Sequence, residues 1–415
     1  MKRRNFIQAF LGTGFLTAGL LKEVQCKGGV VDYSLLDKAL QKPVLRTHYF
    51  KNPIIIQKID LLKNGKEFLV RVVSRDGAEG LAVSNPAKMR FLYPLFLQQV
   101  APFFIGKDAR QLEDLIEGVY VYKSNYKMQG LAFWVCVASL EFAILDLLGQ
   151  IARIPIGELL GGVKRKKIAV YRANNHRDKT AEESVELIKK SIEETGAKAV
   201  KYKIGGRMSK NKDSLPGRTE KLIYLVRKEL GDDITLYADS NGSYDPPEAI
   251  RIGRMLEETR VSFFEEPCPF DHYEDTKIVA DTLDIPIAGG EQESSLYRFR
   301  WMIHTNTLQV VQPDLFYFGG MIRSMRVANM AATVGIPCTP HISGGGLGYV
   351  YMLHFASCVP DPGPYQEYKG ETSIPFTCDS STLQSEKGVV QVPSGPGLGL
   401  KIDRNFIRKA KIVKG

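Results

Sequence analysis

The chain has 415 residues, of which 44% are hydrophobic and 25% are charged. This composition excludes collagen, disordered chains and disulfide-rich miniproteins, and the length allows two or three domains. The net charge is +10, but basic residues alternate with acidic ones and the densest basic run, Lys164–Lys167, contains no aromatic residue. We therefore expect no nucleic-acid partner, and a small anionic substrate instead.

The first 26 residues are typical of an export signal. Three basic residues precede an apolar segment from Phe6 to Leu21, which is shorter than the roughly 20 residues of a membrane span. The pair Arg3-Arg4, followed by Asn5-Phe6, resembles a bacterial twin-arginine signal. We therefore expect residues 1–26 to be a signal segment and the protein to be periplasmic or otherwise exported from a bacterium. An N-terminal amphipathic helix is the alternative, which its glycines disfavour. No other segment is expected to approach the length of a membrane span.

Residues 32–160 are predicted to form an α+β unit. Strand-like runs between residues 53 and 83, with a turn at Asp76-Gly77, indicate an antiparallel meander. Residues 86–150 are mostly helical, because apolar positions from Trp134 onward repeat at i, i+3 and i+4. Gly149 is expected to end that helix.

Short apolar runs alternate with helical segments from residue 161 to 375, which indicates parallel βα units. About eight such runs favour a closed barrel over a doubly wound sheet. The predicted fold class is therefore α/β, a (β/α)7-8 TIM-type barrel. The runs lie at 168–171, 199–204, 234–239, 261–266, 285–291, 308–314, 336–341 and 364–369, and the helices near 181–195, 218–230, 246–258, 272–283, 295–305, 320–334 and 348–357.

Polar residues stand at the end of one predicted strand after another, where barrel enzymes place their chemistry. Asp239, Glu265 and Glu291 end successive strands, so their carboxylates should converge at the barrel mouth. Carboxylate oxygens suit Mg²⁺, whereas zinc would be expected to have Cys or His ligands as well. We expect one Mg²⁺ per subunit.

Two further pairs complete the set. Lys201 and Lys203 leave their strand on the same face, and two close ammonium groups should lower each other's pKa, which makes one of them a usable base. Asp314 and His341 end consecutive strands, so the aspartate can orient the imidazole. The alternatives are solvated surface lysines and a structural histidine. A lysine base, a divalent metal and a His-Asp pair together indicate proton abstraction next to a carboxylate.

These residues resemble the mandelate racemase subgroup of the enolase superfamily over about residues 53–403. The matching motifs are K-x-K at Lys201–Lys203, D-x-N-G at Asp239–Gly242, E-E-P at Glu265–Pro267, G-G-E at Gly289–Glu291, Q-P-D at Gln312–Asp314 and P-H at Pro340–His341. Around Asp314, aromatic residues replace a basic residue common in the family.

The resemblance implies that residues 32–160 are a capping domain to which residues 376–415 return. It implies that Asp239, Glu265 and Glu291 bind Mg²⁺. Lys203 would be the base on one face, beside Lys201, which would polarise the substrate carboxylate. His341, oriented by Asp314, would be acid or base on the other face, and Glu367 would donate to the substrate carboxylate when protonated.

The predicted reaction is dehydration of a sugar acid to a 2-keto-3-deoxy acid, favoured by family analogy. The alternatives are a racemase, epimerase or cycloisomerase of a 2-hydroxy or sugar acid, and an exported sugar-acid binding protein without catalysis. Arg172, Asn174, Asn175 and Asn241 are candidate contacts to substrate hydroxyls, with an ordinary loop as the alternative for the first three. A homo-oligomer is expected by analogy with other barrels.

Overall fold

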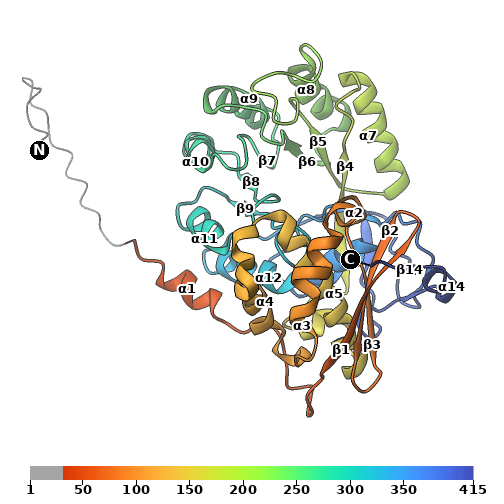
Figure 1. The fold of residues 1–415 in the computed structure, drawn as a ribbon. Helices are drawn as coiled ribbons and strands as arrows, with labels where there is room; N and C mark the ends of the chain where they lie inside the picture. The colour runs from red at the N-terminus through yellow and green to blue at the C-terminus, as the bar shows by residue number, and fades with distance from the viewer. Residues whose placement is uncertain (1–30, 415) are drawn as a thin grey trace, which may run out of the picture. The chain divides into compact units, whose positions relative to one another are not determined.

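Parallel strands and helices alternate through the larger part of the chain (Figure 1). The structure is a computed structural model that describes residues 31–414, and the chain from Tyr33 onward forms one compact unit. The strands of the barrel are β4 (Lys167–Asn174), β5 (Ala199–Lys203), β6 (Thr235–Asp239), β7 (Phe263–Glu265), β8 (Ile287–Gly289), β9 (Val310–Val311) and β10 (Gln366–Glu367). The helices between and after them are α7 (Ala181–Thr195), α8 (Arg218–Leu230), α9 (Pro246–Glu258), α10 (Tyr273–Thr282), α11 (Leu296–His304), α12 (Met321–Ala332), the short 3-10 turn Gly346–Gly348 and α13 (Tyr349–Cys358).

The parallel strands follow the order β10-β4-β5-β6-β7-β8-β9. Beyond β9 the ring continues through two isolated parallel bridges, Val311 to Cys338 and Asp314 to His341. The amide of Cys338 then donates to the carbonyl of Asp361, at 2.8 Å, just before β10. This closed arrangement confirms the predicted α/β barrel. The strand predicted at 336–341 is reduced to those two bridges, because its prolines lack the N–H that a strand ladder needs.

Local signals explain why the predicted helix bounds agree closely with those observed. Thr180 caps α7 by accepting from the amide of Glu183, whose carboxylate in turn accepts from the amide of Thr180. Asp245 caps α9, and Pro246 occupies the first helical position. Between such helices the strands are buried; in β5 every residue is buried, including its two lysines.

The predicted meander is present as an antiparallel sheet in the order β14-β1-β2-β3. Its first strands are joined to the barrel by a set of helices, and we call the sheet and these helices the cap. The cap comprises α1 (Ser34–Leu40), β1 (Ile56–Asn64), β2 (Glu67–Ser74), β3 (Glu79–Val83), α2 (Pro86–Leu95), the π-helical turn Phe96–Val100, α3 (Ala101–Phe104), the 3-10 turn Ala109–Gln111, α4 (Leu112–Val121), the 3-10 turn Tyr122–Met128, α5 (Leu131–Ala152) and α6 (Ile156–Leu159).

Helix α5 corrects two expectations. It is the one helix among the described residues that is long and apolar enough to cross a membrane, and 89% of its most apolar window is buried inside the protein. It also continues past Gly149 and ends at Ala152, where Arg153 caps it with φ 58°. Gly149 serves close packing instead, since a Cβ there would lie 2.5 Å from the Cα of Gly397.

The C-terminal segment pairs with both parts of the fold. Its elements are β11 (Phe376–Thr377), β12 (Val389–Gln391), β13 (Lys401–Ile402), α14 (Arg404–Arg408) and β14 (Lys411–Ile412). β12 pairs antiparallel with β4 of the barrel, and β14 pairs antiparallel with β1 of the cap. The boundaries 32–160, 161–375 and 376–415 stay predictions, and the signal segment lies outside the described residues.

Candidate active site

The strand register brings the predicted residues together at one end of the barrel. Lys203 pairs with Asp239 across β5 and β6, and Asp239 pairs with Glu265 across β6 and β7. The bridge between Asp314 and His341 makes these two residues neighbours as well. Because the strands are parallel, equal positions on successive strands reach the same edge of the sheet.

Both lysines of β5 are buried and ion-paired. The ammonium of Lys201, which is 1% exposed, donates to both carboxylate oxygens of Glu265 at 2.7 and 2.9 Å. Lys203 contacts the carboxylate of Asp239 and lies 3.3 Å from the Oδ1 of Asn241. Burial alone lowers the pKa of Lys201, but the Glu265 carboxylate and its neighbours outweigh it and raise that pKa well above its usual value. The expectation that the paired lysines lower each other's pKa is therefore wrong for Lys201.

The carboxylates beside these lysines respond differently to burial. Burial raises the pKa of Asp239, but the ammonium groups of Lys203 and Lys201 outweigh this and hold it well below its usual range. Burial and the nearby Asp239 carboxylate raise the pKa of Glu265 to about 7. Burial, followed by the charge of Glu291, raises the pKa of Glu266 well above its usual value.

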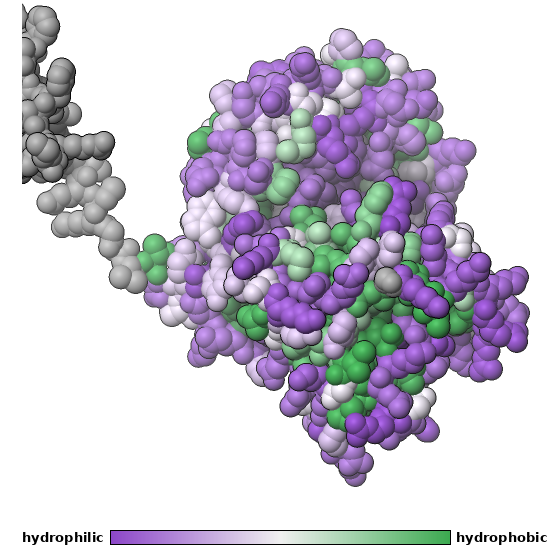
Figure 2. Space-filling model, viewed as in Figure 1, coloured by the Kyte–Doolittle hydropathy of each residue, from purple (hydrophilic) through white to green (hydrophobic). Residues whose placement is uncertain are grey.

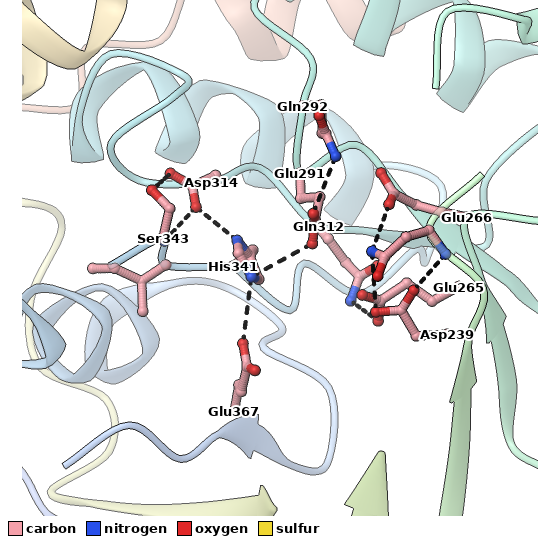
Figure 3. A network of polar contacts seen from close by, with 12 residues as sticks. Asp239, Glu265, Glu266, Glu291, Gln292, Gln312, Asp314, His341, Ser343 and Glu367 are labelled. Carbon is pink, nitrogen blue, oxygen red and sulfur yellow. Dashed lines mark hydrogen bonds and ion pairs between the residues drawn. The ribbon is translucent and has the colours of Figure 1, made fainter. Parts of the chain in front are cut away.

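Glu291 lies between the two halves of the site, as Figure 3 shows. One of its oxygens is 3.4 Å from Nε2 of His341, and the other accepts from Gln292 at 3.3 Å. On the far side, Gln312 donates to Glu265 at 3.0 Å and Asn241 donates to Glu266 at 3.1 Å. Within residues 31–414 no three His, Cys, Asp or Glu side chains are already arranged to hold a metal ion.

The chemistry of these residues nevertheless fits Mg²⁺. Asp239, Glu265 and Glu291 supply only carboxylate oxygens, and all three are buried. The buried Oε1 of Glu266 has no hydrogen-bond partner, which marks a local excess of negative acceptors. The raised pKa values of Glu265 and Glu266 show the same excess, because crowded carboxylates resist ionisation.

The other half of the site is the His-Asp pair. Nδ1 of His341 lies 2.6 Å from Oδ2 of Asp314. Asp314 is completely buried and also accepts from the amides of Phe316, Tyr317 and Ser343, at 2.8, 2.7 and 2.5 Å. These backbone donors fix the carboxylate, which fixes the ring and leaves Nε2 for chemistry.

Glu367 has a partner that the sequence prediction missed. The ammonium of Lys369 lies 3.0 Å from Oε2 of Glu367, 3.4 Å from Nε2 of His341, and donates to the carbonyl of Ile342 at 2.7 Å. Burial raises the pKa of Glu367, but Lys369 and the other cations outweigh it and hold this pKa well below its usual range. Glu367 is thus ion-paired with Lys369 in this structure, and its role as a donor to the substrate carboxylate stays a prediction.

His341 is subject to opposing influences. Burial lowers its pKa, the Glu291 carboxylate raises it, Lys369 lowers it and the hydrogen bond to Asp314 raises it. The net result is a pKa above the usual value for histidine. The imidazolium form is therefore more stable than in a free histidine side chain, which suits a proton donor.

A cavity of about 650 Å³ opens onto these groups and is lined by Lys203, Glu291, His341 and Glu367. Figure 2 shows hydrophilic and hydrophobic residues meeting along the hollow between the barrel helices and the cap. The barrel loops also contribute Asn175, Arg207, Gln292, Tyr317, Ser343, Gly344 and Lys369, and the cap contributes Lys88, Phe91, Leu92, Leu131, Ala132 and Val135. The volume suits a small molecule.

Of the four predicted substrate contacts, two lie at or beside the cavity and two do not. Asn175 lines the cavity, and Asn241 stands in the carboxylate cluster beside it. Asn174 does not line it, because its amide donates to the carbonyl of Ser184 and accepts from the amide of His176. Arg172 lies over the ring of Tyr368 instead, 5.1 Å from the ring centre. Lys201 is also absent from the cavity wall, and its contact with a substrate carboxylate stays a prediction.

Several lining residues were missed, and some of them carried a signal. Lys369 follows Glu367 with the two-residue spacing that drew attention to Lys201 and Lys203, so it shares a strand face with Glu367. Arg207 lies in the loop directly after β5. Lys88, on α2, had no such signal, since nothing in the sequence shows which cap residues face the barrel.

A family profile, described as "Enolase C-terminal domain-like", matches residues 183–406, which is more than half of the chain. The chain belongs to the enolase superfamily. Two relatives in this superfamily are an arabinonate dehydratase of Saccharolobus solfataricus, 29% identical over 72% of this chain and 78% of the relative, and a D-galactarolactone cycloisomerase of Agrobacterium fabrum, 27% identical over 76% and 84%.

A solved structure shares the fold of this enolase-superfamily chain over nearly its full length. It is a mandelate racemase/muconate lactonizing protein of Paracoccus denitrificans Pd1222 complexed with magnesium, with a TM-score of 0.77 and 26% identity over 87% of this chain and 99% of that one. Together with the dehydratase and the cycloisomerase, it confirms the prediction of an enolase-superfamily lyase or isomerase.

Proposed function

We propose that the protein is a Mg²⁺-dependent enzyme that removes the proton α to the carboxylate of a sugar acid and dehydrates it to a 2-keto-3-deoxy acid. The observation that carries the proposal is the placing of Lys203 and His341 on one cavity, in different parts of the ring. The segment of His341 is separated from β5 by β10 and β4 on one side and by β6 to β9 on the other. A substrate between them meets a base on one face and an acid on the other.

The dehydration begins with removal of the proton at C2 and ends with loss of the hydroxyl at C3 as water. Lys203, in its amine form, takes the C2 proton at Nζ, and the electron pair moves into the carboxylate as an ene-diolate. The C3–O bond then breaks, the hydroxyl leaves with a proton from Nε2 of His341, and water departs. The enol tautomerises, and R–CHOH–CHOH–COO⁻ becomes R–CH₂–CO–COO⁻ plus H₂O. Asp314 holds the imidazole through Nδ1 throughout.

Asp239, Glu265 and Glu291 are the residues that would hold the metal. Bound there, Mg²⁺ would supply positive charge for the negative charge that develops on the substrate carboxylate. Lys369 and Glu367 flank Nε2 of His341 and position the leaving-group side of the substrate.

The same residues also support a second outcome. Without a hydroxyl at C3, proton transfer between Lys203 and His341 on opposite faces would racemise or epimerise C2, and an internal nucleophile would give cycloisomerisation. The cycloisomerase among the relatives favours keeping this alternative. A sugar-acid binding protein without catalysis would not need the lysine base or the His-Asp pair.

One experiment separates these functions. A panel of sugar acids is incubated with the protein in D₂O, with and without Mg²⁺, and keto-acid formation and deuterium at C2 are measured. Keto acid that requires Mg²⁺ supports the dehydratase, and exchange without keto acid supports a racemase or epimerase. Binding without either product would show that the catalytic proposal is wrong.

We further propose that the protein is exported through its twin-arginine segment. We also propose that its subunits form a homo-oligomer. The support for export is the sequence of residues 1–26. Replacing both Arg3 and Arg4 by lysine should leave the protein in the cytoplasm of the host cell, as measured by fractionation. Unchanged export of that variant would contradict the route, and light scattering would measure the number of subunits.

A further inference from the structure

Two cations on the cavity wall have no anionic partner. Lys88, from α2 of the cap, and Arg207, from the loop after β5, both line the cavity of about 650 Å³. Neither forms an ion pair with any residue that the structure describes. Within residues 31–414 the guanidinium of Arg207 donates only to a neutral group, the Oδ1 of Asn241, at 3.3 Å.

Lys88 and Tyr317 lie together on the cavity wall. The ammonium of Lys88 lies over the ring of Tyr317, 5.7 Å from its centre. Burial and the Asp314 carboxylate raise the pKa of Tyr317, while the charge of Arg207 is near enough to lower it. Tyr317 lines the cavity too, so this phenol and both cations share one cavity.

The other charged groups of the cavity already have partners. Glu291 faces His341, Glu367 faces Lys369, and Lys203 contacts Asp239. The cap residues beside Lys88 are apolar: Phe91, Leu92, Leu131, Ala132 and Val135. Lys88 is therefore the one charged group among the cap residues that line this cavity.

We propose that the cavity is built for a substrate with an anionic group at both ends, in which Lys88, Arg207 and Tyr317 bind the distal anion. The inference rests on the proposed function, which uses the first carboxylate at the reacting end. The distal anion would be the second carboxylate of an aldaric acid, or the phosphate of an aldonic acid phosphate. Either one supplies oxygen acceptors for the ammonium, the guanidinium and the phenol.

The test compares acids that differ only at the distal end. Galactarate and glucarate, galactonate and gluconate, and the 6-phosphates of the two aldonic acids are assayed with the Mg²⁺-loaded full chain. We expect kcat/KM for substrates with two anionic groups to exceed that for galactonate and gluconate at least tenfold. Preference for the 6-phosphates over the aldaric acids would support the inference and identify the distal anion as phosphate.

Two variants localise the effect. Lys88→Gln and Arg207→Gln should each lower kcat/KM for the doubly anionic substrates about five- to tenfold, mainly through KM, because the distal contact forms equally in the ground and transition states. The matched controls are Arg90→Gln, on the same helix, and Lys210→Gln, in the same loop, since neither residue lines the cavity. These should change kcat/KM less than twofold.

The outcomes separate the two proposals. Equal or better turnover of galactonate and gluconate, or unchanged KM in both cavity variants, would overturn this inference and leave the proposed function standing. The absence of deuterium exchange and of keto acid with every acid in the panel would overturn the proposed function, and the inference with it.

Discussion

The two halves of the site hold their catalytic groups in different ways. On the lysine face, formed by Lys201, Lys203, Asp239 and Glu265, buried side chains neutralise one another through ion pairs. On the histidine face, formed by Asp314, His341, Glu367 and Lys369, the key carboxylate is held by three backbone amides. The lysine face therefore depends on the balance of its own charges, whereas the histidine face is fixed by the fold of the loops after β9 and at His341.

This difference suits the two faces to different roles, proton removal on the lysine face and proton donation on the histidine face. On the lysine face one backbone amide, that of Asn241, donates to Asp239 at 2.8 Å, so protons and cations can exchange among the buried charges with few backbone contacts to break. A ring anchored through Nδ1 presents Nε2 in one orientation, which is what a directed proton donor needs. Substitutions on the two faces should therefore have different effects on C2 exchange and on dehydration.

The largest effect is expected on the lysine face. Lys203→Gln should abolish both deuterium exchange at C2 and keto-acid formation, with a loss of roughly 10²- to 10⁴-fold in kcat, because both reactions begin with the same proton abstraction. Exchange followed by NMR in D₂O measures the first step directly. Lys212→Gln, an exposed lysine in the loop after β5, is the control; exchange at the wild-type rate in Lys203→Gln would exclude Lys203 as the base.

The next effect should separate the faces. His341→Asn is expected to lose keto-acid formation by roughly 10²- to 10⁴-fold while C2 exchange continues, since the proton donor is missing but the base remains. The two rates are measured on one sample. If exchange and dehydration fell together, the faces would not act independently.

A smaller loss of kcat should follow from removing the carboxylate that holds His341. Asp314→Asn is expected to reduce kcat by about ten- to a hundredfold, because the ring loses its anchor. The hydrogen bond to Asp314 raises the pKa of His341, and a proton donor stops working as the pH rises through its pKa. The alkaline limb of the pH-rate profile should therefore move to lower pH; a limb that stayed in place would show that Asp314 does not act on the titration of the ring.

The smallest loss of kcat is expected at Lys369, where the alkaline limb should move in the opposite direction from that of Asp314→Asn. Lys369 lowers the pKa of His341, so Lys369→Met should move the alkaline limb to higher pH, with kcat reduced only about two- to tenfold. Lys369→Arg keeps the charge and should leave the limb near its wild-type position. A shift to lower pH in Lys369→Met would mean that another group controls this limb.

Apart from Lys369, the sequence pointed to the residues of both faces, because their spacing follows the barrel. Asp239, Glu265 and Glu291 recur at the length of one βα unit, and such a repeat survives any detail of side-chain packing. The pairings between side chains could not be predicted in this way. Nothing along the chain shows that Glu265 binds Lys201 with both oxygens, or that Glu291 faces His341.

The errors have local physical causes. Asn174 stands in a polar segment typical of a binding loop, but its side-chain amide donates a hydrogen bond to the carbonyl of Ser184, ten residues later. Gly149 had the position of a helix end, but its missing side chain makes room for the returning chain at Gly397. Contacts between distant segments decide both cases, and a single sequence does not display them.

The pairing of β14 with β1 has a consequence for how the protein is made. Leu62 is paired with Ile412, so the ribosome must synthesise the whole barrel after β1 before the fourth strand of the cap sheet exists. Until then β1 presents an open edge, which is a site for pairing with other chains. Such distant pairing also slows folding. We therefore expect the short strand β14 to control the yield of folded protein more than its size suggests, and truncation after Asp403 to cause aggregation during synthesis.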